Sequence, residues 1–428
     1  MNLPLFQGLE RERTGPRSFA DELRAFRWKN QRTVVNATVA PVAPDGTTVS
    51  VETFVNEFWT SRQRAAHSLH EISYRACFKP QLPSFFIERL TVPGAVVYDP
   101  FLGRGTTLLE AALLGRIPFG CDVSPLSAIL VAPRLDPPTL DEVAQRLECI
   151  DFGCESGPFQ DLLVFYHPDT LRELGSLRRY LLDREHRGEA DRIDRWIRMV
   201  AVNRLTGHSP GFFSVYTLPP NQALSIESQR KINEKRAQTP PRRSVPTLIL
   251  SKTRSLLRDC DPDTRVRLSL PFTRAQVFTG PASATPRIPS ASVDLIVTSP
   301  PFLDVVNYAA DNWLRCWFCG VNSGDVRLTV VRKLDEWQAA MTQVFVELSR
   351  VLKVGGHVAF EVGEVRGGAV RLEQTVIPCG LATGLTAELV LINAQRFTKT
   401  ANVWGVTNNA KGTNSNRVVL FRKPRGQA

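Results

Sequence analysis

Residues 85–135 alternate short apolar runs with a stretch of helical period. Ala95–Tyr98 and Ile117–Cys121 are apolar segments of strand length, and the apolar positions of Thr106–Leu114 recur with the spacing of one helix face. A glycine turn, Gly103-Arg104-Gly105, joins the first apolar run to this helix. Strand, glycine turn, helix and strand in this order predict the first half of a doubly wound parallel sheet.

The same alternation returns after residue 274. Its predicted elements are the strands Ala275–Phe278, Val293–Val297 and His357–Val362, a helix over Asp335–Lys353, and two final strands, Ala387–Phe397 and Val418–Arg422. Between the two halves, this alternation of strands and helices is interrupted by charged helical stretches, Leu171–Leu182 and Arg192–Arg204. We therefore predict an α/β fold, a doubly wound sheet with a helical insertion.

This pattern divides the 428-residue chain into four parts. We expect an N-terminal extension over 1–75, with a helix near Val51–Ser61, and one half of the α/β domain over 76–135. A basic helical insertion follows over 136–273, and the second half of the domain over 274–428. The length suffices for one large α/β domain that carries an insertion.

Positive charge is concentrated in two segments. The chain has 53 Lys and Arg against 42 Asp and Glu, a formal net charge of +11. Residues 230–274 carry +8 and residues 389–428 carry +7, which leaves −4 for the remainder. A basic contact surface on a near-neutral body is typical of a nucleic-acid binder. We expect the two segments to flank one cleft.

Composition excludes several other classes of protein. No run of about 18 apolar residues occurs, so we expect no membrane span. The first residues lack the apolar core of a secretion signal, and the eight cysteines are scattered, so we expect reduced thiols and a cytoplasmic location. The six histidines show no ligand spacing, and Cys316 and Cys319 lie in an apolar aromatic run, so we predict no metal.

The loop after the first strand has the residue types of a nucleotide-like cofactor site. It reads Asp99-Pro100-Phe101-Leu102-Gly103-Arg104-Gly105-Thr106, and a GxG turn between strand and helix usually places such a ligand at the carboxyl edge of the sheet. No Lys follows the glycines, which excludes a Walker A loop. Asp99 suits a ligand with an amine or a sulfonium cation, and Asp122 can accept hydrogen bonds from ribose hydroxyls. S-adenosylmethionine (AdoMet) meets both demands; a purely structural turn is the alternative.

A second motif, Thr298-Ser299-Pro300-Pro301-Phe302, follows the strand Val293–Val297. The prolines lack backbone donors and leave their carbonyls as fixed acceptors. Ser299 and the Pro300 carbonyl suit an exocyclic amine, and Phe302 suits the face of a planar base that has left the duplex. The alternative is a proline-rich loop that ends a strand.

Together, these motifs resemble those of the AdoMet-dependent DNA amino-methyltransferases. The segments that carry the resemblance are DPFLGRGTT at 99–107, GCDVSP at 120–125 and TSPPF at 298–302, within regions 70–135 and 274–423. The resemblance implies a Rossmann-like class I methyltransferase fold, with an AdoMet-binding half before the insertion and a catalytic half after it. A serine before the prolines and an aromatic residue after them are typical of the members that methylate N4 of cytosine.

The resemblance also implies roles for particular residues. Ser299, Pro300, Pro301 and Phe302 would hold the target base. The residues expected around AdoMet are Lys79, Pro80, Asp99, Phe101, Gly103, Gly105, Thr106 and Asp122. Among them, Asp99 would support the loop. The chain departs from the family at Arg104, where a small residue is usual, and at Pro281, where an Asp commonly follows the glycine.

We therefore expect a site-specific DNA methyltransferase that transfers a methyl group from AdoMet to N4 of cytosine, in restriction-modification or phage defence. The expected partner is DNA, with a cognate endonuclease or defence-system subunits as further partners and no membrane. Three alternatives stay open: an N6-adenine DNA methyltransferase, an RNA base methyltransferase, and an inactive methyltransferase fold that binds DNA within a defence complex.

Target recognition is expected in the insertion, because it holds most of the +8 segment and the aromatic residues Phe212, Phe213 and Tyr216, which look exposed. The alternative is a helical cap. The loop Thr398–Gly405 is expected either to contact DNA or to be a polar hairpin tip.

Overall fold

The structure is a computed structural model. It describes residues 18–43, 45–60, 66–74, 77–153, 159–217, 223–301, 308–322, 324, 326, 333–365, 370–394 and 415–425.

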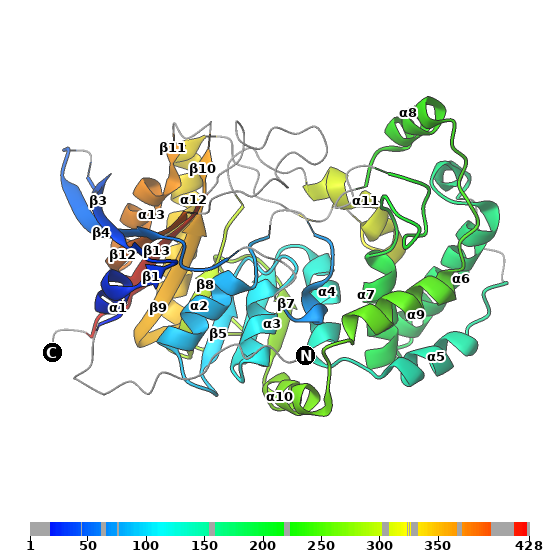
Figure 1. Ribbon diagram of the computed structural model, residues 1–428, viewed down its shortest axis with the longest axis horizontal. Helices are drawn as coiled ribbons and strands as arrows, with labels where there is room; N and C mark the ends of the chain where they lie inside the picture. The colour runs from blue at the N-terminus through cyan, green and yellow to red at the C-terminus, as the bar shows by residue number, and fades with distance from the viewer. Residues whose placement is uncertain are drawn as a thin grey trace.

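Within these residues, nine strands form one sheet in the order β3-β4-β12-β13-β9-β8-β5-β6-β7 (Figure 1). The strands are β3 Val34–Pro41, β4 Thr48–Asn56, β5 Val96–Asp99, β6 Ile117–Asp122, β7 Gln276–Thr279, β8 Val293–Thr298, β9 Leu352–Val362, β12 Thr386–Ala394 and β13 Ser415–Arg422. β7, β6, β5, β8 and β9 pair in parallel, whereas β13 is antiparallel to β9 and β12. The predicted doubly wound sheet is confirmed, and the chain crosses over to place β8 beside β5.

Helices cover both faces of this sheet, which explains why its central strands are apolar on both sides. Tyr98 and Phe360 pack in a core with α12 (Leu334–Val351) and α13 (Leu372–Leu381). Their neighbours Val97 and Ala359 pack on the other face, in a core with α2 (Gln81–Leu90). Successive side chains of a strand point to opposite faces, so one apolar run supplies both cores.

The insertion forms a helical body of its own. Its helices lie between β6 and β7 in the chain: α4 Pro125–Leu135, α5 Leu140–Glu148, η3 Gln160–Val164, α6 Pro168–His186, α7 Arg192–Val202, α8 Ile226–Arg236, α9 Val245–Leu256 and α10 Pro262–Phe272. They share a core with α3 (Thr106–Leu113) and α11 (Tyr308–Cys319), which attaches the helical body to one end of the sheet (Figure 1). The remaining short elements are α1 Phe19–Ala25, η2 Ser68–His70 and the hairpins β1 Arg27–Trp28 with β2 Gln31–Arg32 and β10 Glu364–Val365 with β11 Val370–Arg371.

The predicted helix near Val51–Ser61 is wrong. β4 (Thr48–Asn56) is a strand, paired in parallel with β12 and antiparallel with β3. Its β-branched residues fit a pleated surface, and its partner β12 is contributed by sequence more than 300 residues away. The N-terminal region therefore lengthens the main sheet by two strands.

The expected exposure of two aromatic residues in the insertion is also wrong. Phe213 is fully buried and Phe212 is 6% exposed, whereas Tyr216 is half-buried, with the guanidinium of Arg236 3.9 Å from its ring centroid. The structure describes no helix that is long and apolar enough to cross a bilayer.

Candidate functional site

Asp99, at the carboxyl end of β5, is buried beneath the glycine loop. Its Oδ1 accepts the hydroxyl of Thr298 at 2.6 Å and the backbone N–H of Phe101 at 3.1 Å. Burial raises the pKa of this carboxyl to about 7, and the Thr298 hydrogen bond opposes the rise. With 1% of its surface exposed, Asp99 connects the loop to the end of β8, the strand that leads into the second motif.

The glycine loop has a backbone that only glycine adopts readily. Gly103 and Gly105 have φ of 50° and 74°, in the left-handed region. A Cβ on Gly105 would lie 2.2 Å from a methyl carbon of Val131 in α4, so α3 and α4 approach each other closely at this point. The loop is closed by Asp122 at the end of β6, whose carboxylate accepts the N–H groups of Gly103 at 2.8 Å and Ser124 at 2.9 Å.

Arg104, the residue at which the sequence departs from the family, points beneath the loop. Its guanidinium donates to Thr106 Oγ1 at 3.1 Å and to the carbonyls of Ile72 and Phe78, each at 3.3 Å. The side chain therefore attaches the loop to the segment that leads into Lys79. Burial and the neighbouring Arg104 charge lower the pKa of Lys79.

The chemistry of these residues fits AdoMet. Each carboxylate oxygen of Asp122 accepts one backbone hydrogen bond and keeps a second lone pair for a ribose hydroxyl. A Cβ on Gly103 would meet nothing nearer than 3.8 Å, so a ligand can approach its backbone. The cations of Lys79 and Arg104 give this end of the loop a positive potential that suits the carboxylate of an amino acid.

Ser299 begins a buried polar chain at the end of β8. Its hydroxyl donates to Oε2 of Glu361 in β9, and the amide of Asn416 in β13 donates to the other oxygen, Oε1, at 3.0 Å. Glu361 is 6% exposed, and burial raises its pKa against the effect of both hydrogen bonds. Sequence reasoning missed Glu361, although a carboxylate near the carboxyl end of the apolar run His357–Val362 is a signal that could have found it.

The two prolines are held differently. Pro300 is buried, and the carbonyl of Pro301 accepts the indole N–H of Trp337 in α12 at 3.0 Å. This bond fixes the loop against the helix on one face of the sheet. Phe302 and the loop Thr398–Gly405 lie outside the described residues.

Most of the described basic residues of the C-terminal segment lie away from this site. Arg417 pairs with Glu373 at 2.6 Å, and β13 runs antiparallel to β9, which takes Arg422, Lys423 and Arg425 to the opposite, amino edge of the sheet. Because Arg396, Lys399 and Lys411 of the same segment lie outside the described residues, the expectation that both basic segments border one cleft stays a prediction.

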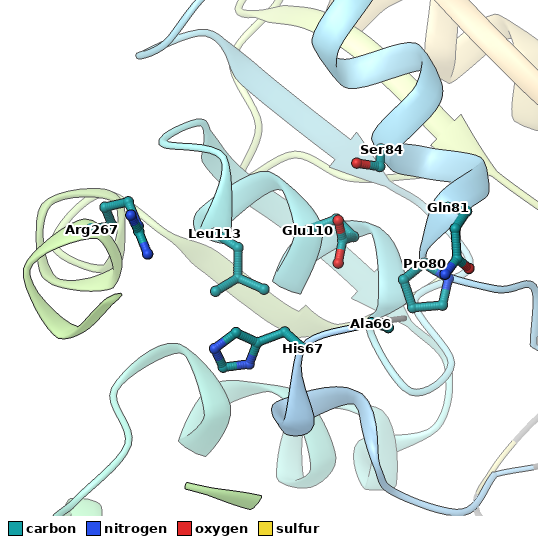
Figure 2. A pocket seen from close by; sticks show the side chains of 8 residues that line it. All are labelled: Ala66, His67, Pro80, Gln81, Ser84, Glu110, Leu113 and Arg267. Carbon is teal, nitrogen blue, oxygen red and sulfur yellow. The ribbon is translucent and has the colours of Figure 1, made fainter. Parts of the chain in front are cut away.

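Figure 2 shows a cavity of about 260 Å³ between α2, α3 and α10. It is lined by Ala66, His67, Pro80, Gln81, Ser84, Glu110, Leu113 and Arg267. Among the residues predicted for the site, Pro80 alone belongs to this lining, so the cavity is a different place from the Ser299 edge. The carboxyl ends of β5, β6, β8 and β9 bring together the other described residues of both motifs.

Comparison with known proteins agrees with the motifs. Residues 26–127 match the family model described as DNA methylase. The Type II methyltransferase M.MjaII of Methanocaldococcus jannaschii is 34% identical over 74 residues, 17% of this chain and 14% of that protein. M.BsoBI of Geobacillus stearothermophilus is 24% identical over 313 residues, 64% of this chain and 57% of that protein. The chain thus spans little more than half the length of M.BsoBI and far less of M.MjaII.

Among solved structures, TrmN from Thermus thermophilus superposes with a TM-score of 0.32 and 13% identity, over 85% of this chain and 53% of TrmN. The strand order, with antiparallel β13 between β9 and β12, defines a Rossmann-like class I methyltransferase fold. The family match over residues 26–127 and the similarity to the Type II methyltransferases agree with the resemblance to the AdoMet-dependent DNA amino-methyltransferases seen in the sequence.

Proposed function

We propose that this protein transfers a methyl group from AdoMet to the N4 amine of cytosine at specific sites in duplex DNA, as the modification enzyme of a restriction-modification or defence system in the cytoplasm. The observation that carries the proposal is the hydrogen bond from Ser299 to Glu361. Its partner would be a cognate endonuclease, against which the methylation protects DNA, or another subunit of the defence system.

The residues around the glycine loop would bind the cofactor. AdoMet supplies an electrophilic methyl group on a sulfonium sulfur. Asp122 would accept the ribose hydroxyls, Gly103 and Gly105 would let the backbone approach the cofactor, and Lys79 would face its carboxylate. Asp99 supports the loop, while Pro80, Phe101 and Thr106 complete its surroundings.

Ser299 is oriented as an acceptor for an amine. Because its hydroxyl hydrogen is directed to Glu361, the lone pairs of Oγ are left for an N–H of the substrate. The Pro300 carbonyl would accept the second amine hydrogen. Two acceptors on one amine favour a localised lone pair on nitrogen. Methylation then releases one proton, which the Ser299–Glu361 pair would accept.

The target base has to leave the duplex to reach this edge, since its amine is paired inside the helix. Phe302 would stack on its face. A serine before the prolines and an aromatic residue after them support cytosine as the base, and no covalent bond between enzyme and base is needed. The basic insertion, 136–273, would hold the DNA.

Tritiated AdoMet incubated with genomic DNA, followed by nucleoside mass spectrometry, tests this function. We expect N4-methylcytosine as the labelled product, and Ser299→Ala should abolish transfer while AdoMet still binds. Label in N6-methyladenine alone, label only in RNA, or DNA binding without any transfer would overturn the proposal.

A further inference from the structure

α8 (Ile226–Arg236) differs from the other helices of the insertion in what it buries. All its residues are described, and Gln229 alone is fully buried; Glu227, Arg230, Lys231 and Glu234 are among the exposed side chains. A helix that is polar on nearly every side has no apolar stripe with which to pack. Something other than hydrophobic burial must therefore hold it in place.

A network of side-chain amides holds α8. Gln229 and Gln238 both donate to the carbonyl of Tyr216, at 3.0 and 3.1 Å. Both also donate to Oδ1 of Asn233, at 2.8 Å each. Asn233 in turn donates to the carbonyl of Val164 at 2.7 Å. The inner face is thus fixed in register by directional bonds, and the outer face is left to solvent.

The segment before α8 is bonded to the helix that follows the catalytic motif in the chain. The N–H of Ala223 donates to the carbonyl of Asp311 at 3.0 Å, and the indole of Trp313 donates to the carbonyl of Leu224 at 3.1 Å. Asp311 and Trp313 belong to α11. In Figure 1, α8 lies above α11 towards the right end of the molecule, on the same upper side as β10 and β11, which follow the carboxyl end of β9 towards the left.

The charge of α8 and of the segment that follows it suits a polyanionic ligand. Residues 226–243 hold six basic and two acidic residues. The acidic residues differ in their surroundings: Glu227 pairs with Lys231 at 2.7 Å, whereas Glu234 has no ion-pair partner in the described part of the chain. Phosphates repel a carboxylate, but the N4 amine of a cytosine in the major groove is a donor that a Glu accepts.

We propose that α8 is the helix that reads the DNA target, lying in the major groove beside the site of methylation. Arg230 and Lys235 contact phosphates, and Glu234 reads a base edge. The eleven residues of α8 span about 16 Å, and the major groove, about 12 Å wide, admits one helix. This inference rests on the proposed action on duplex DNA.

The first test measures binding of a 30-base-pair duplex of mixed sequence at several salt concentrations, for the full chain. The double variant Arg230→Gln/Lys235→Gln should raise Kd at least tenfold and reduce the slope of log K against log salt by about two. The matched control, Arg422→Gln/Arg425→Gln, removes the same charge at the amino edge of the sheet and should bind within twofold of the wild type.

The second test sequences methylated positions in plasmid DNA from cells that produce each protein. Glu234→Gln should relax the preference at one position of the target while AdoMet affinity is unchanged. If the α8 variants match the control and the wild type in affinity, salt slope and target, α8 is not the reading helix, although the methyltransferase activity stands. If the wild type neither binds duplex DNA nor methylates it, the proposed function itself fails, and this inference with it.

Discussion

Two carboxylates are buried near the carboxyl ends of β5 and β9, the strands on either side of β8, and both are hydrogen-bonded to hydroxyl groups of the second motif. Asp99 accepts the hydroxyl of Thr298, and Glu361 accepts that of Ser299. A buried carboxylate is costly unless it is bonded, so both are positioned by their partners and position them in return. Successive residues of one motif are thus fixed from two different strands.

Glu361 should act through Ser299 and not through stability alone. In Glu361→Gln, the amide can accept a hydrogen from Ser299 or from Asn416 but cannot accept both, so Ser299 loses its fixed orientation. We expect kcat to fall about 10- to 100-fold, a size ordinary for proton-transfer and hydrogen-bonding groups, with the KM for AdoMet unchanged. Methyl transfer measured from pH 5 to 9 checks this.

The pH dependence of the methyl-transfer rate separates a role of Glu361 in positioning Ser299 from a role in stability alone. Because burial raises the pKa of Glu361, the wild-type rate should depend on an ionisation above the ordinary glutamate range, and the Gln variant should lose it. Glu388→Gln is the control, since this exposed residue pairs with His357, towards the amino edge of the sheet. Equal losses in kcat for both variants, with unchanged profiles, would contradict a positioning role for Glu361.

Asp99 should make stability depend on pH. Its pKa is raised from 3.8 to about 7 by burial, so between about pH 4 and 7 the folded protein keeps a proton that the unfolded chain has lost. Stability from this group therefore falls as pH rises through that window and is constant above it. Asp99→Asn removes the effect.

The difference in free energy of unfolding, wild type minus Asp99→Asn, should accordingly fall between pH 4 and 8 by up to about 4 kcal/mol, at about 1.4 kcal/mol per pKa unit. Urea unfolding at a series of pH values measures it. A difference that stays constant with pH would show that Asp99 has the same pKa folded and unfolded.

At the scale of elements, the start of α3 is set by its contact with α4. Gly105 is the N-cap of α3 in a left-handed conformation, and Val131 of α4 occupies the space where a side chain would lie. The backbone conformation of the turn and the close packing of α3 on α4 therefore both require a glycine at position 105. The glycine loop owes its shape to this packing as well as to Asp122.

Gly105→Ala should therefore be costly for two reasons, φ strain and overlap with Val131. We expect a loss of about 2–5 kcal/mol in the free energy of unfolding, of which φ strain contributes about 1–2 kcal/mol. Gly188 has a similar φ of 70° but open space around it, so Gly188→Ala reports the strain alone.

Removing the Val131 methyl groups tests the overlap. The double variant Gly105→Ala/Val131→Ala should be less destabilised than the sum of its single variants, because the contact that the alanine violates is gone. Urea unfolding of all four proteins gives the coupling free energy. Strict additivity, or a Gly105→Ala loss no larger than that of Gly188→Ala, would contradict the packing requirement.

At the scale of the whole molecule, the sheet is assembled from distant parts of the chain. β4 pairs with β12, and Asn393 at the end of β12 binds the chain just after β4: its Oδ1 accepts the N–H groups of Phe58 at 2.7 Å and Trp59 at 3.2 Å. Asn393 is fully buried. The N-terminal strands are therefore part of the fold that supports the site.

Asn393→Ala should weaken this attachment. It leaves two buried N–H groups without an acceptor, and we expect a loss of about 2–4 kcal/mol in the free energy of unfolding. Hydrogen exchange should accelerate across residues 48–59 more than in β5 or β8. Asn36→Ala, an exposed asparagine on the edge strand β3, should leave both measurements near wild type.

The sequence by itself determined the parallel core and its two motifs. Apolar runs long enough to be strands, and glycines at the first turn, depend on local chemistry that a single chain segment contains, so β5, β6, β8 and β9 were all predicted. The resemblance to the DNA amino-methyltransferases rests on the same residues. Ser299 and Asp122 were identified because polar residues just after buried strands gather at one edge of a parallel sheet.

Only the tertiary structure decided what depends on distant partners. Thr48–Asn56 is a strand because β12 pairs with it. Phe213 is buried in the core of the helical body, and Phe212 is buried against Arg204 and Gly207. Most of the described C-terminal basic residues are carried to the amino edge by the direction of β13. The role of Glu361 follows from its hydrogen bond with Ser299, which lies 62 residues earlier in the chain. Local pattern fixes which residues are apolar or charged, whereas which of them meet is a property of the folded chain.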